Sequence, residues 1–472
     1  MIDKIGCQPG RAMSKSVTVL LSQCCRTRTS VQPPLGLGYL AAVLRQAGHN
    51  VAILGPRDFT ASPETFVDSV RKHGPDIIGL SFLTPSLPAV RDWVRALRAW
   101  DAQVPVVLGG PHVTALPDHA LRYTGADYAV LGEGENVFRS LVDCISQGSV
   151  GVVSGVVRSE VLCERIERAP LIEDLDSLPF PAWDLIKPEQ YPPTPHGAFY
   201  RRSPVAPLIT TRGCPFDCSF CASKTTWHRR LRCRSPESVV HEVEYLTRYH
   251  GIREIHFEDD NLTARKEHAA AICEGLLSCG LDITWTCPNG VRIDSLDRDL
   301  LRLMRRSGCY MLGLGIETAN QSLSDAVGKH LDLSCLEETV HLMKEIGIGT
   351  YGFFLLGLPG ETRATAHETI DLACRLPFDQ VHFGHLVPLP GSRIFTDWLG
   401  GRDLDGVPWD RFDYKVRSLW RTEALSADEI TQLRRKAWIR FYLRPRPLLR
   451  MASKIRPRQI PFLVERIITG RV

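Results

Sequence analysis

The sequence predicts an α/β protein in which an N-terminal doubly wound parallel sheet is followed by a partial (β/α)6 barrel and a small helical C-terminal region. Three observations predict this class. The chain has 472 residues, enough for two or three domains. Apolar runs alternate with segments of helical period in two separate series. A Pro-rich stretch of little periodicity separates the two series and marks a domain boundary.

The first series predicts a domain over residues 14–150. Its strands are the runs "VTVLL", "VAIL", "DIIGLSF", "VPVVLGG" and "YAVLG". Runs of Val, Ile and Leu without polar alternation are typical of strands that are buried on both faces of a parallel sheet. Residues 151–203, which include "LPFPAWDLIKPEQYPPTPHGAF", are expected to form an extended connector or a small cap.

The second series, over residues 204–400, contains six β/α units with the strands "VAPLIT", "EIHFED", "ITWTC", "YMLGLGIE", "GTYGFFLLG" and "QVHFGHLVP". A closed barrel of this kind needs eight strands, so we expect a barrel that is open on one side. Residues 401–472 are helical and basic, and Glu465 is the only acid after Glu429. This tail could face an anionic surface, but a solvated basic face on a packing region is the commoner case.

Composition excludes several classes of protein. A net charge of +4, with 44% hydrophobic and 23% charged residues, is that of a globular protein and gives no sign of a nucleic-acid partner. The number of cysteines, 15, is odd, and most of them are scattered along the chain. This pattern disfavours a secreted protein with a disulfide framework and favours a protein of the reducing cytoplasm. "VTVLLSQCC" is too short to be a secretory signal, and no run approaches the roughly 20 apolar residues of a membrane-spanning helix.

The stretch "TTRGCPFDCSFCAS" places Cys214, Cys218 and Cys221 in one short loop after a strand. The spacing C-x3-C-x2-C lets three sulfurs converge on one metal centre. One candidate is a structural zinc with His228 as the fourth ligand. The other is a four-iron cluster, in which three thiolates leave one iron without a protein ligand.

Polar residues and glycines gather where the strands of the second series are expected to end. The segments are "FEDDN", "CPNGVRID", "LGIET", "GLPGET" and "VPLPGS". Because the carboxyl ends of barrel strands form the active-site mouth, these segments are expected to meet there.

The motif "RGCPFDCSFC" resembles the cluster motif of the radical S-adenosylmethionine (SAM) superfamily. The resemblance implies that the three cysteines hold a [4Fe-4S] cluster, that SAM chelates the fourth iron, and that Phe220 lies beside the adenine. Asp259 and Asp260 then offer carboxylates to the SAM amino group, and Arg292 could pair with its carboxylate.

The remaining predicted SAM contacts are Asn289 and Glu317 for the ribose and Gly357 and Gly360 for the flat base, which glycine lets the backbone approach. Helix N-capping is the alternative role for Asp259, Asp260 and Glu317.

The first domain carries "GLGYLAAVLRQAGHNV", "GLSFLTPSL", "VVLGGPHVTALP" and "YAVLGEGE". This set resembles the cobalamin-binding domain of the radical SAM subclass that contains anaerobic magnesium-protoporphyrin ester cyclase and carbon methylases. The predicted cofactor contacts lie at strand ends, where a doubly wound sheet opens its ligand crevice, and they are Ser81, Gly109, Gly110, His112, Gly132 and Glu133. The loop after the first strand contains no histidine, so it supplies no axial histidine to cobalt. His112 is a candidate contact, although histidines in such loops are more often packed or capping.

The resemblances imply a cytoplasmic enzyme that uses a [4Fe-4S] cluster, SAM and cobalamin to methylate an unactivated carbon of a small-molecule or lipid-like substrate. A cyclase or rearrangement enzyme of the same subclass is the alternative, and a non-catalytic cobalamin or redox sensor is a third hypothesis. An electron donor such as flavodoxin or ferredoxin is implied as a partner. A weak membrane contact through the basic C-terminal region is a further hypothesis.

Overall fold

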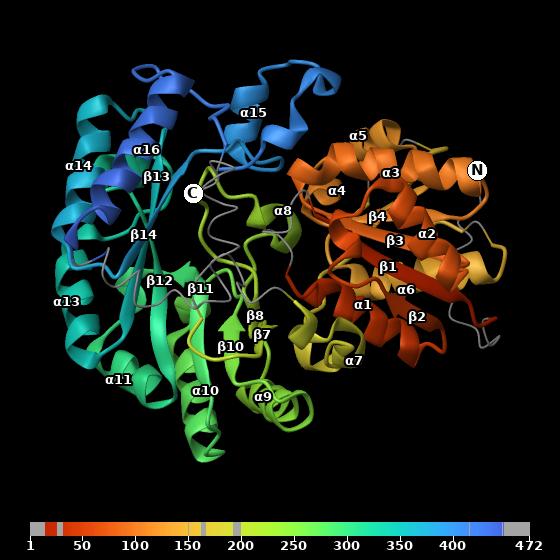
Figure 1. Cartoon of the computed structure of the whole chain (residues 1–472), viewed down its shortest axis with the longest axis horizontal. Helices are drawn as coiled ribbons and strands as arrows, with labels where there is room; N and C mark the ends of the chain where they lie inside the picture. Colours follow the sequence, from red (N-terminus) through yellow and green to blue (C-terminus); the bar gives the residue numbers. More distant parts are fainter. Residues whose placement is uncertain are drawn as a thin grey trace. The chain divides into compact units, whose positions relative to one another are not determined.

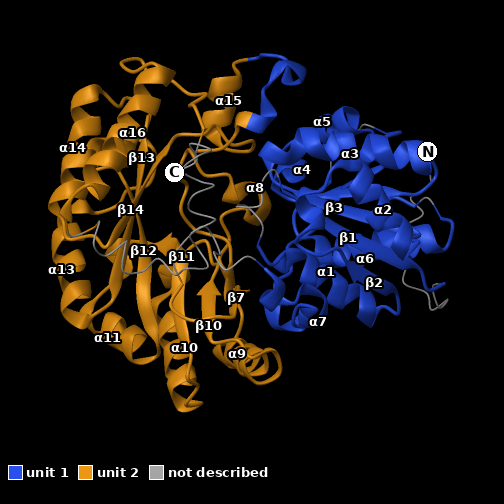
Figure 2. Ribbon diagram, viewed as in Figure 1, with its two compact units in different colours: residues 1–191, 401–410 blue, residues 192–400, 411–472 orange. Residues whose placement is uncertain are grey.

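The computed structural model describes residues 15–25, 32–149, 151–161, 167–191, 200–414, 416–445 and 447. By internal contacts the chain forms two compact units (Figures 1 and 2). Unit 1 contains residues 1–191 and 401–410, and unit 2 contains residues 192–400 and 411–472. The expected boundaries at residues 150 and 203 stay predictions. The return of residues 401–410 to unit 1 was not expected from the sequence.

Unit 1 is built on a sheet of six strands in the order β2, β1, β3, β4, β5, β6. The strands are β1 (Thr18–Cys24), β2 (Asn50–Ile53), β3 (Ile77–Phe82), β4 (Val106–Gly109), β5 (Tyr128–Val130) and β6 (Val156–Arg158). The first five are parallel, as the apolar runs predicted. The sixth pairs antiparallel with β5 and lies in the stretch that was expected to be a connector.

Helices cover the sheet of unit 1 on both faces, which makes it doubly wound (Figure 1). Helix α1 packs with α6, and α3 packs with α2 and α5. The helices are α1 (Leu35–Gln46), α2 (Pro63–His73), α3 (Leu87–Trp100), α4 (Pro111–Ala115), α5 (Pro117–Thr124), α6 (Gly134–Ser146) and α7 (Trp183–Ile186). The core between α1, α6 and the sheet is apolar and includes Leu21, Leu37 and Phe138.

Unit 2 contains six parallel strands in the order β14, β13, β12, β11, β10, β7, so the predicted partial barrel is confirmed. These strands are β7 (Val205–Leu208), β10 (Glu254–Phe257), β11 (Thr284–Val291), β12 (Cys309–Glu317), β13 (Gly349–Leu356) and β14 (Gln380–His385). A separate antiparallel pair is formed by β8 (Thr211–Arg212) and β9 (Arg232–Cys233). No pairing between the end strands β7 and β14 closes the sheet among the described residues.

Helices follow the strands of unit 2 in alternation. They are α8 (Ser223–Trp227), α9 (Pro236–His250), α10 (Lys266–Ser278), α11 (Arg298–Arg306), α12 (Gln321–Ala326), α13 (Leu336–Ile346), α14 (Arg363–Arg375), α15 (Arg393–Leu399) and α16 (Ala427–Tyr442). Hydroxyl or carboxyl side chains cap several of them, as Ser235 does for α9 and Asp297 for α11. The basic C-terminal helix predicted from the sequence is α16, and it packs against β14 and α14.

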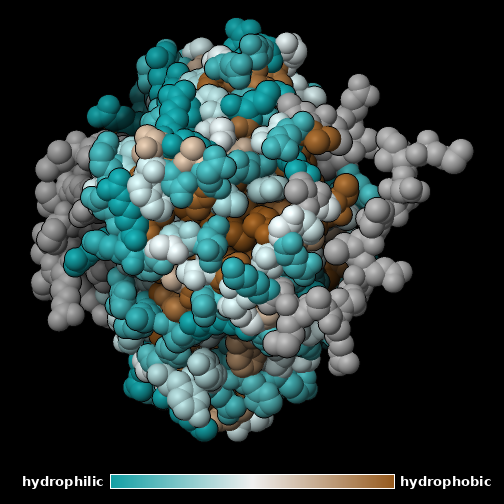
Figure 3. Space-filling model, turned by 90° about the vertical axis from the view of Figure 1, so that its right-hand side faces the viewer, coloured by the Kyte–Doolittle hydropathy of each residue, from teal (hydrophilic) through white to brown (hydrophobic). Residues whose placement is uncertain are grey.

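No helix in the described ranges has the length and apolar character to cross a membrane. On the face drawn in Figure 3, hydrophilic residues predominate and separate the hydrophobic areas from one another. The predicted membrane contact was assigned to the C-terminal region, residues 401–472, and the part of this region after residue 447 lies outside the described residues.

Candidate functional site

The three-cysteine loop lies between β8 and α8 in unit 2. Cys214, Cys218 and Cys221 are free thiols and are all partly exposed. Gly213, just before the first of them, has a φ of 94°, and a Cβ atom there would lie 2.1 Å from the carbonyl oxygen of Arg230. Glycine is therefore required for the chain to enter this loop.

The three thiols interact electrostatically with one another. Burial raises the pKa of Cys221 to about 12, with smaller contributions in the same direction from Asp260, Cys218 and Cys214. Burial also raises the pKa of Cys214 and of Cys218. An iron cluster would reverse this effect, because a bound metal centre deprotonates coordinating thiols. The donor set of three neighbouring soft thiols fits an iron–sulfur cluster.

No group of three His, Cys, Asp or Glu side chains in the described part of the chain has the compact geometry that holds a single metal ion. His228, the candidate fourth zinc ligand, is exposed and follows the C-terminal end of α8.

Asp259 anchors the chain segment that leads into the cysteine loop. Its side chain is 3% exposed, and its Oδ1 accepts hydrogen bonds from Thr210 N (3.1 Å) and Thr211 N (2.5 Å). The hydroxyl groups of Thr210 and Thr211 donate to the same oxygen over 2.9 and 2.6 Å. Burial raises the pKa of Asp259 to about 6, although these donors oppose the shift. With four protein donors on one oxygen, the carboxylate anchors the loop.

Asp260, the neighbouring predicted carboxylate, lies differently. It is exposed, its Oδ2 accepts a hydrogen bond from Ser223 Oγ over 2.7 Å, and its charge acts on Cys214 and Cys221. Asn289 is also exposed and donates to the carbonyl oxygen of Glu258 over 2.9 Å. The segment containing Asn289 was expected to follow its strand, but β11 continues to Val291 through a register shift.

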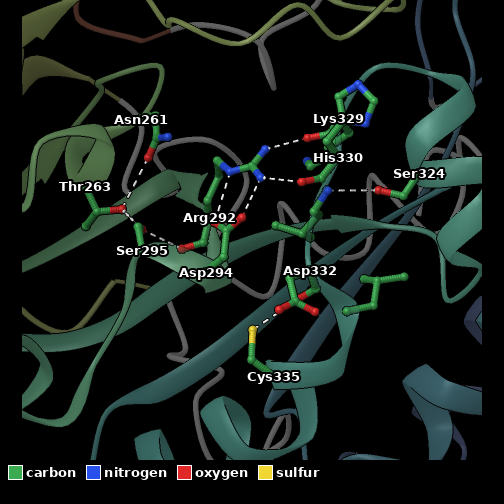
Figure 4. Close-up of polar contacts among 12 residues, drawn as sticks. Asn261, Thr263, Arg292, Asp294, Ser295, Ser324, Lys329, His330, Asp332 and Cys335 are labelled. Atoms are coloured by element: carbon green, nitrogen blue, oxygen red, sulfur yellow. Dashed lines mark hydrogen bonds and ion pairs between the residues drawn. The ribbon is translucent and has the colours of Figure 1, made fainter.

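Arg292 follows β11 and is almost fully engaged by protein atoms (Figure 4). Its guanidinium donates to both carboxylate oxygens of Asp294 (3.0 and 2.5 Å) and to the carbonyl oxygens of Lys329 (2.7 Å) and His330 (3.0 Å). Its Cζ also lies 3.9 Å from the ring centroid of Phe216, which belongs to the cysteine loop. Arg292 is 8% exposed, so it links three loops and has little capacity left for a SAM carboxylate.

Glu317, the last residue of β12, forms an ion pair that sequence reasoning missed. Its Oε1 lies 2.6 Å from Nζ of Lys329, and the two side chains are 16% and 10% exposed. Glu317 has a φ of 68°, which is strained for a residue with a side chain, so the local fold holds it in place. The charge of Lys329 acts to lower the pKa of Cys214 and Cys218, against the effect of burial. The segment that carries Lys329 is bonded to the cysteine loop, because Ser219 N donates to the carbonyl oxygen of Val327 over 2.8 Å.

The "GLPGET" loop after β13 is organised by Glu361, another residue that sequence reasoning did not single out. Its buried carboxylate accepts hydrogen bonds from the backbone amides of Gly357 and Leu358. Gly357 and Gly360 have φ values of 87° and 80°, so glycine permits both turns. Leu358 belongs to an apolar cluster with Leu323, Val327, Leu386 and Ile394, and the side chain of Phe220 packs against that cluster.

In unit 1 the predicted cobalamin contacts lie at the carboxyl ends of β3, β4 and β5. A Cβ at Gly110 would approach Phe82 O to 2.8 Å, whereas a Cβ at Gly109 or Gly132 would meet no atom within 4 Å. Ser81 is partly exposed and lies beside Gly109 in the sheet register. Open space above two strand-end glycines fits a bulky ligand at this edge of the sheet.

His112 and Glu133 are occupied by protein contacts. His112 is 1% exposed, its Nδ1 lies 3.2 Å from Thr84 Oγ1, and its ring lies edge-on to Trp409 of the returning segment. Burial lowers the pKa of His112 to about 3, with a further effect of His119, so its imidazole is neutral. Glu133 Oε2 accepts a hydrogen bond from Ile172 N over 2.8 Å. Both residues hold surrounding segments against the sheet.

Comparison with known families matches both units. Residues 24–142 match the B12 binding domain, and residues 208–373 match the radical SAM superfamily.

An uncharacterized methyltransferase of Pyrococcus horikoshii is 32% identical over 450 residues, which cover 93% of each chain. The anaerobic magnesium-protoporphyrin IX monomethyl ester cyclase of Rubrivivax gelatinosus is 28% identical, over 87% of this chain and 74% of its own. Among solved structures, the radical SAM methyltransferase TsrM of Kitasatospora setae, with cobalamin and a [4Fe-4S] cluster bound, has a TM-score of 0.67 at 21% identity. That match covers 83% of this chain and 77% of TsrM.

Proposed function

Because this chain belongs to the radical SAM enzymes that carry a B12-binding domain, we propose that it methylates an unactivated carbon of a small-molecule or lipid-like substrate. The chain is a cobalamin-dependent radical SAM enzyme, and its cofactors are a [4Fe-4S] cluster, SAM and cobalamin. When bound, the cluster supplies the electron that cleaves SAM and cobalamin supplies the methyl group. The observation that carries the proposal is the three-thiol loop beside the Glu317–Lys329 ion pair, in a chain that is similar over 93% of its length to a methyltransferase.

In this proposal Cys214, Cys218 and Cys221 hold the cluster, and the residues around them bind SAM. Asp260 is exposed beside two of the cysteines and accepts the SAM ammonium. Lys329 rather than Arg292 pairs with the SAM carboxylate, because the Arg292 guanidinium makes four hydrogen bonds to an acid and two carbonyls, whereas the Lys329 ammonium, which has three N–H donors, makes one hydrogen bond among the described residues, to Glu317.

The other residues of the proposed SAM pocket contact the ribose, contact the adenine or position the loops. Glu317 and Asn289 bind the ribose, and Gly357 and Gly360 lie against the adenine with Phe220. Asp259, Arg292 and Glu361 are positioning residues, because each holds a loop that carries a contact residue.

In unit 1, Ser81, Gly109, Gly110 and Gly132 line the cobalamin crevice, and His112 and Glu133 support its walls.

A cyclase or rearrangement enzyme is the second candidate, since a cyclase is 28% identical over most of this chain. The two candidates differ in how SAM is consumed. A carbon methylase of this kind uses one SAM as the radical source and a second as the methyl donor, so it releases 5′-deoxyadenosine and S-adenosylhomocysteine. A cyclase releases 5′-deoxyadenosine alone.

The proposal is tested by incubating the anaerobically reconstituted, reduced protein with SAM and cobalamin and measuring both products by mass spectrometry. We expect both nucleosides from the unsubstituted protein and no 5′-deoxyadenosine from Cys218→Ala. The matched control is Cys279→Ala, which removes an exposed thiol remote in sequence from the loop. Absence of S-adenosylhomocysteine would favour the cyclase, and absence of both products would favour a sensor.

A further inference from the structure

Three cationic side chains converge on one carboxylate of the cysteine loop. Asp217 immediately precedes Cys218, and its Oδ1 accepts a hydrogen bond from Lys224 Nζ over 3.2 Å. Its Oδ2 lies 3.4 Å from Arg229 Nη1 and 3.3 Å from Arg393 Nη1. We call Lys224, Arg229 and Arg393 the basic collar.

The collar is attached to the loop through the backbone as well as through charge. Arg393 Nη2 donates to the carbonyl oxygen of Asp217 over 3.0 Å, and Ile394 N donates to the carbonyl oxygen of Ser219 over 3.2 Å. Thr225 Oγ1 donates to the carbonyl oxygen of Gly391 over 3.1 Å. The start of α15 is thus bonded to the cysteine loop, and α8 is bonded both to this loop and to the segment before α15 (both helices are labelled in Figure 1).

The collar carries more positive charge than its acid neutralises. Among the ion pairs of the described residues, Asp217 is the acid shared by all three cations, which leaves a net charge of +2. The side chains of Arg229 and Arg393 are 51% and 53% exposed, so the surplus charge faces solvent. One cation would suffice to order one carboxylate, and exposed ion pairs add little stability.

We propose that the basic collar is the docking site of an acidic one-electron carrier protein of the flavodoxin type. The inference rests on the proposed function, because a cluster in this loop must receive an electron from outside the chain. In the transfer, an anionic flavin hydroquinone is oxidised to the neutral semiquinone and the cluster is reduced from the 2+ to the 1+ state. One electron moves and no proton is required. A basic surface beside the acceptor steers an acidic partner to it.

The test measures reduction of the reconstituted cluster by anaerobic stopped flow with two reductants, purified flavodoxin hydroquinone and dithionite. Arg229→Gln removes one collar charge, and Arg229→Lys retains it. Arg253→Gln is the matched control. It removes an arginine that directly precedes β10, is 46% exposed and pairs with Asp282. Iron and sulfide content is measured first for every variant.

At low ionic strength we expect Arg229→Gln to slow reduction by flavodoxin about threefold to tenfold, because one charge supplies part of the roughly 10- to 10³-fold that a whole steering field contributes. Reduction by dithionite, and reduction of Arg229→Lys and Arg253→Gln by flavodoxin, should stay unchanged. Added salt should slow the unsubstituted protein toward the Arg229→Gln rate. Equal flavodoxin rates in Arg229→Gln and Arg253→Gln would overturn the inference, as would equal slowing by both reductants. An unsubstituted protein that binds no iron would instead overturn the proposed function.

Discussion

Replacement of Arg292 by Ala tests whether this residue is part of the scaffold rather than a SAM ligand. The substitution removes four hydrogen bonds and leaves the Asp294 carboxylate and the carbonyl oxygens of Lys329 and His330 without their donor. It also removes the cation 3.9 Å from the Phe216 ring.

The expected cost is large because the side chain of Arg292 is only 10% exposed. Breaking a buried ion pair costs about 3–5 kcal/mol, and a buried acceptor left without a donor costs about 1–3 kcal/mol. We therefore expect the unfolding free energy of unit 2 to fall by about 4 kcal/mol. For a unit of this size that lowers Tm by roughly 10 °C.

The assay is thermal unfolding of the apoprotein by calorimetry, so that no cofactor contributes. Arg298→Ala is the matched control, because Arg298 forms an ion pair of 2.5 Å with Glu345 but its side chain is 47% exposed. Its Tm should change little. Arg292→Lys should lie between the two, since lysine keeps the charge but cannot form the forked contact. If Arg292→Ala unfolded like Arg298→Ala yet lost SAM affinity, the guanidinium would be a ligand and the scaffold role would be wrong.

Two further predictions concern buried carboxyl groups. Asp259→Ala should lower the iron content after reconstitution by more than half, because four hydrogen bonds to the segment before the cysteines are lost. The helical circular dichroism signal should be retained. An iron content equal to that of the unsubstituted protein would contradict this anchoring role. Burial raises the pKa of Glu361 from 4.5 to about 7, so the folded protein binds a proton more tightly than the unfolded chain. The free energy of unfolding therefore falls as the pH rises from about 4.5 through about 7, and the total loss is up to roughly 3 kcal/mol. Glu361→Gln should flatten the dependence of Tm on pH between 5 and 8, and an unchanged slope would refute the assignment.

The fold was largely predictable because it depends on periodicity. Apolar runs identify strands that are buried on both faces, so five strands of unit 1 and six of unit 2 were found. Strand β6 was missed because a strand of three residues is too short to carry a periodic signal. The contact of Trp409 with His112 was also missed, because a chain segment that returns to an earlier unit leaves no local pattern.

The sequence indicated which loops carry the candidate site, but it could not indicate the partners of each side chain. The predicted residues of unit 2 lie on the cysteine loop and at the strand ends, and their roles as ligands stay predictions. Whether Arg292 or Lys329 offers its charge to a ligand depends on which carbonyls and acids surround each of them, and tertiary packing decides that. The same holds for Asp259 and Asp260, which are adjacent in sequence yet differ in burial and partners.

The proposed function requires that Cys214, Cys218 and Cys221 hold a cluster whose fourth iron is left to SAM. The most direct measurement is electron paramagnetic resonance of the anaerobically reconstituted, reduced protein with and without SAM, together with iron analysis. We expect four irons per chain and a [4Fe-4S] signal whose g values shift when SAM is added. A protein that contains zinc, or a cluster signal that SAM leaves unchanged, would contradict it.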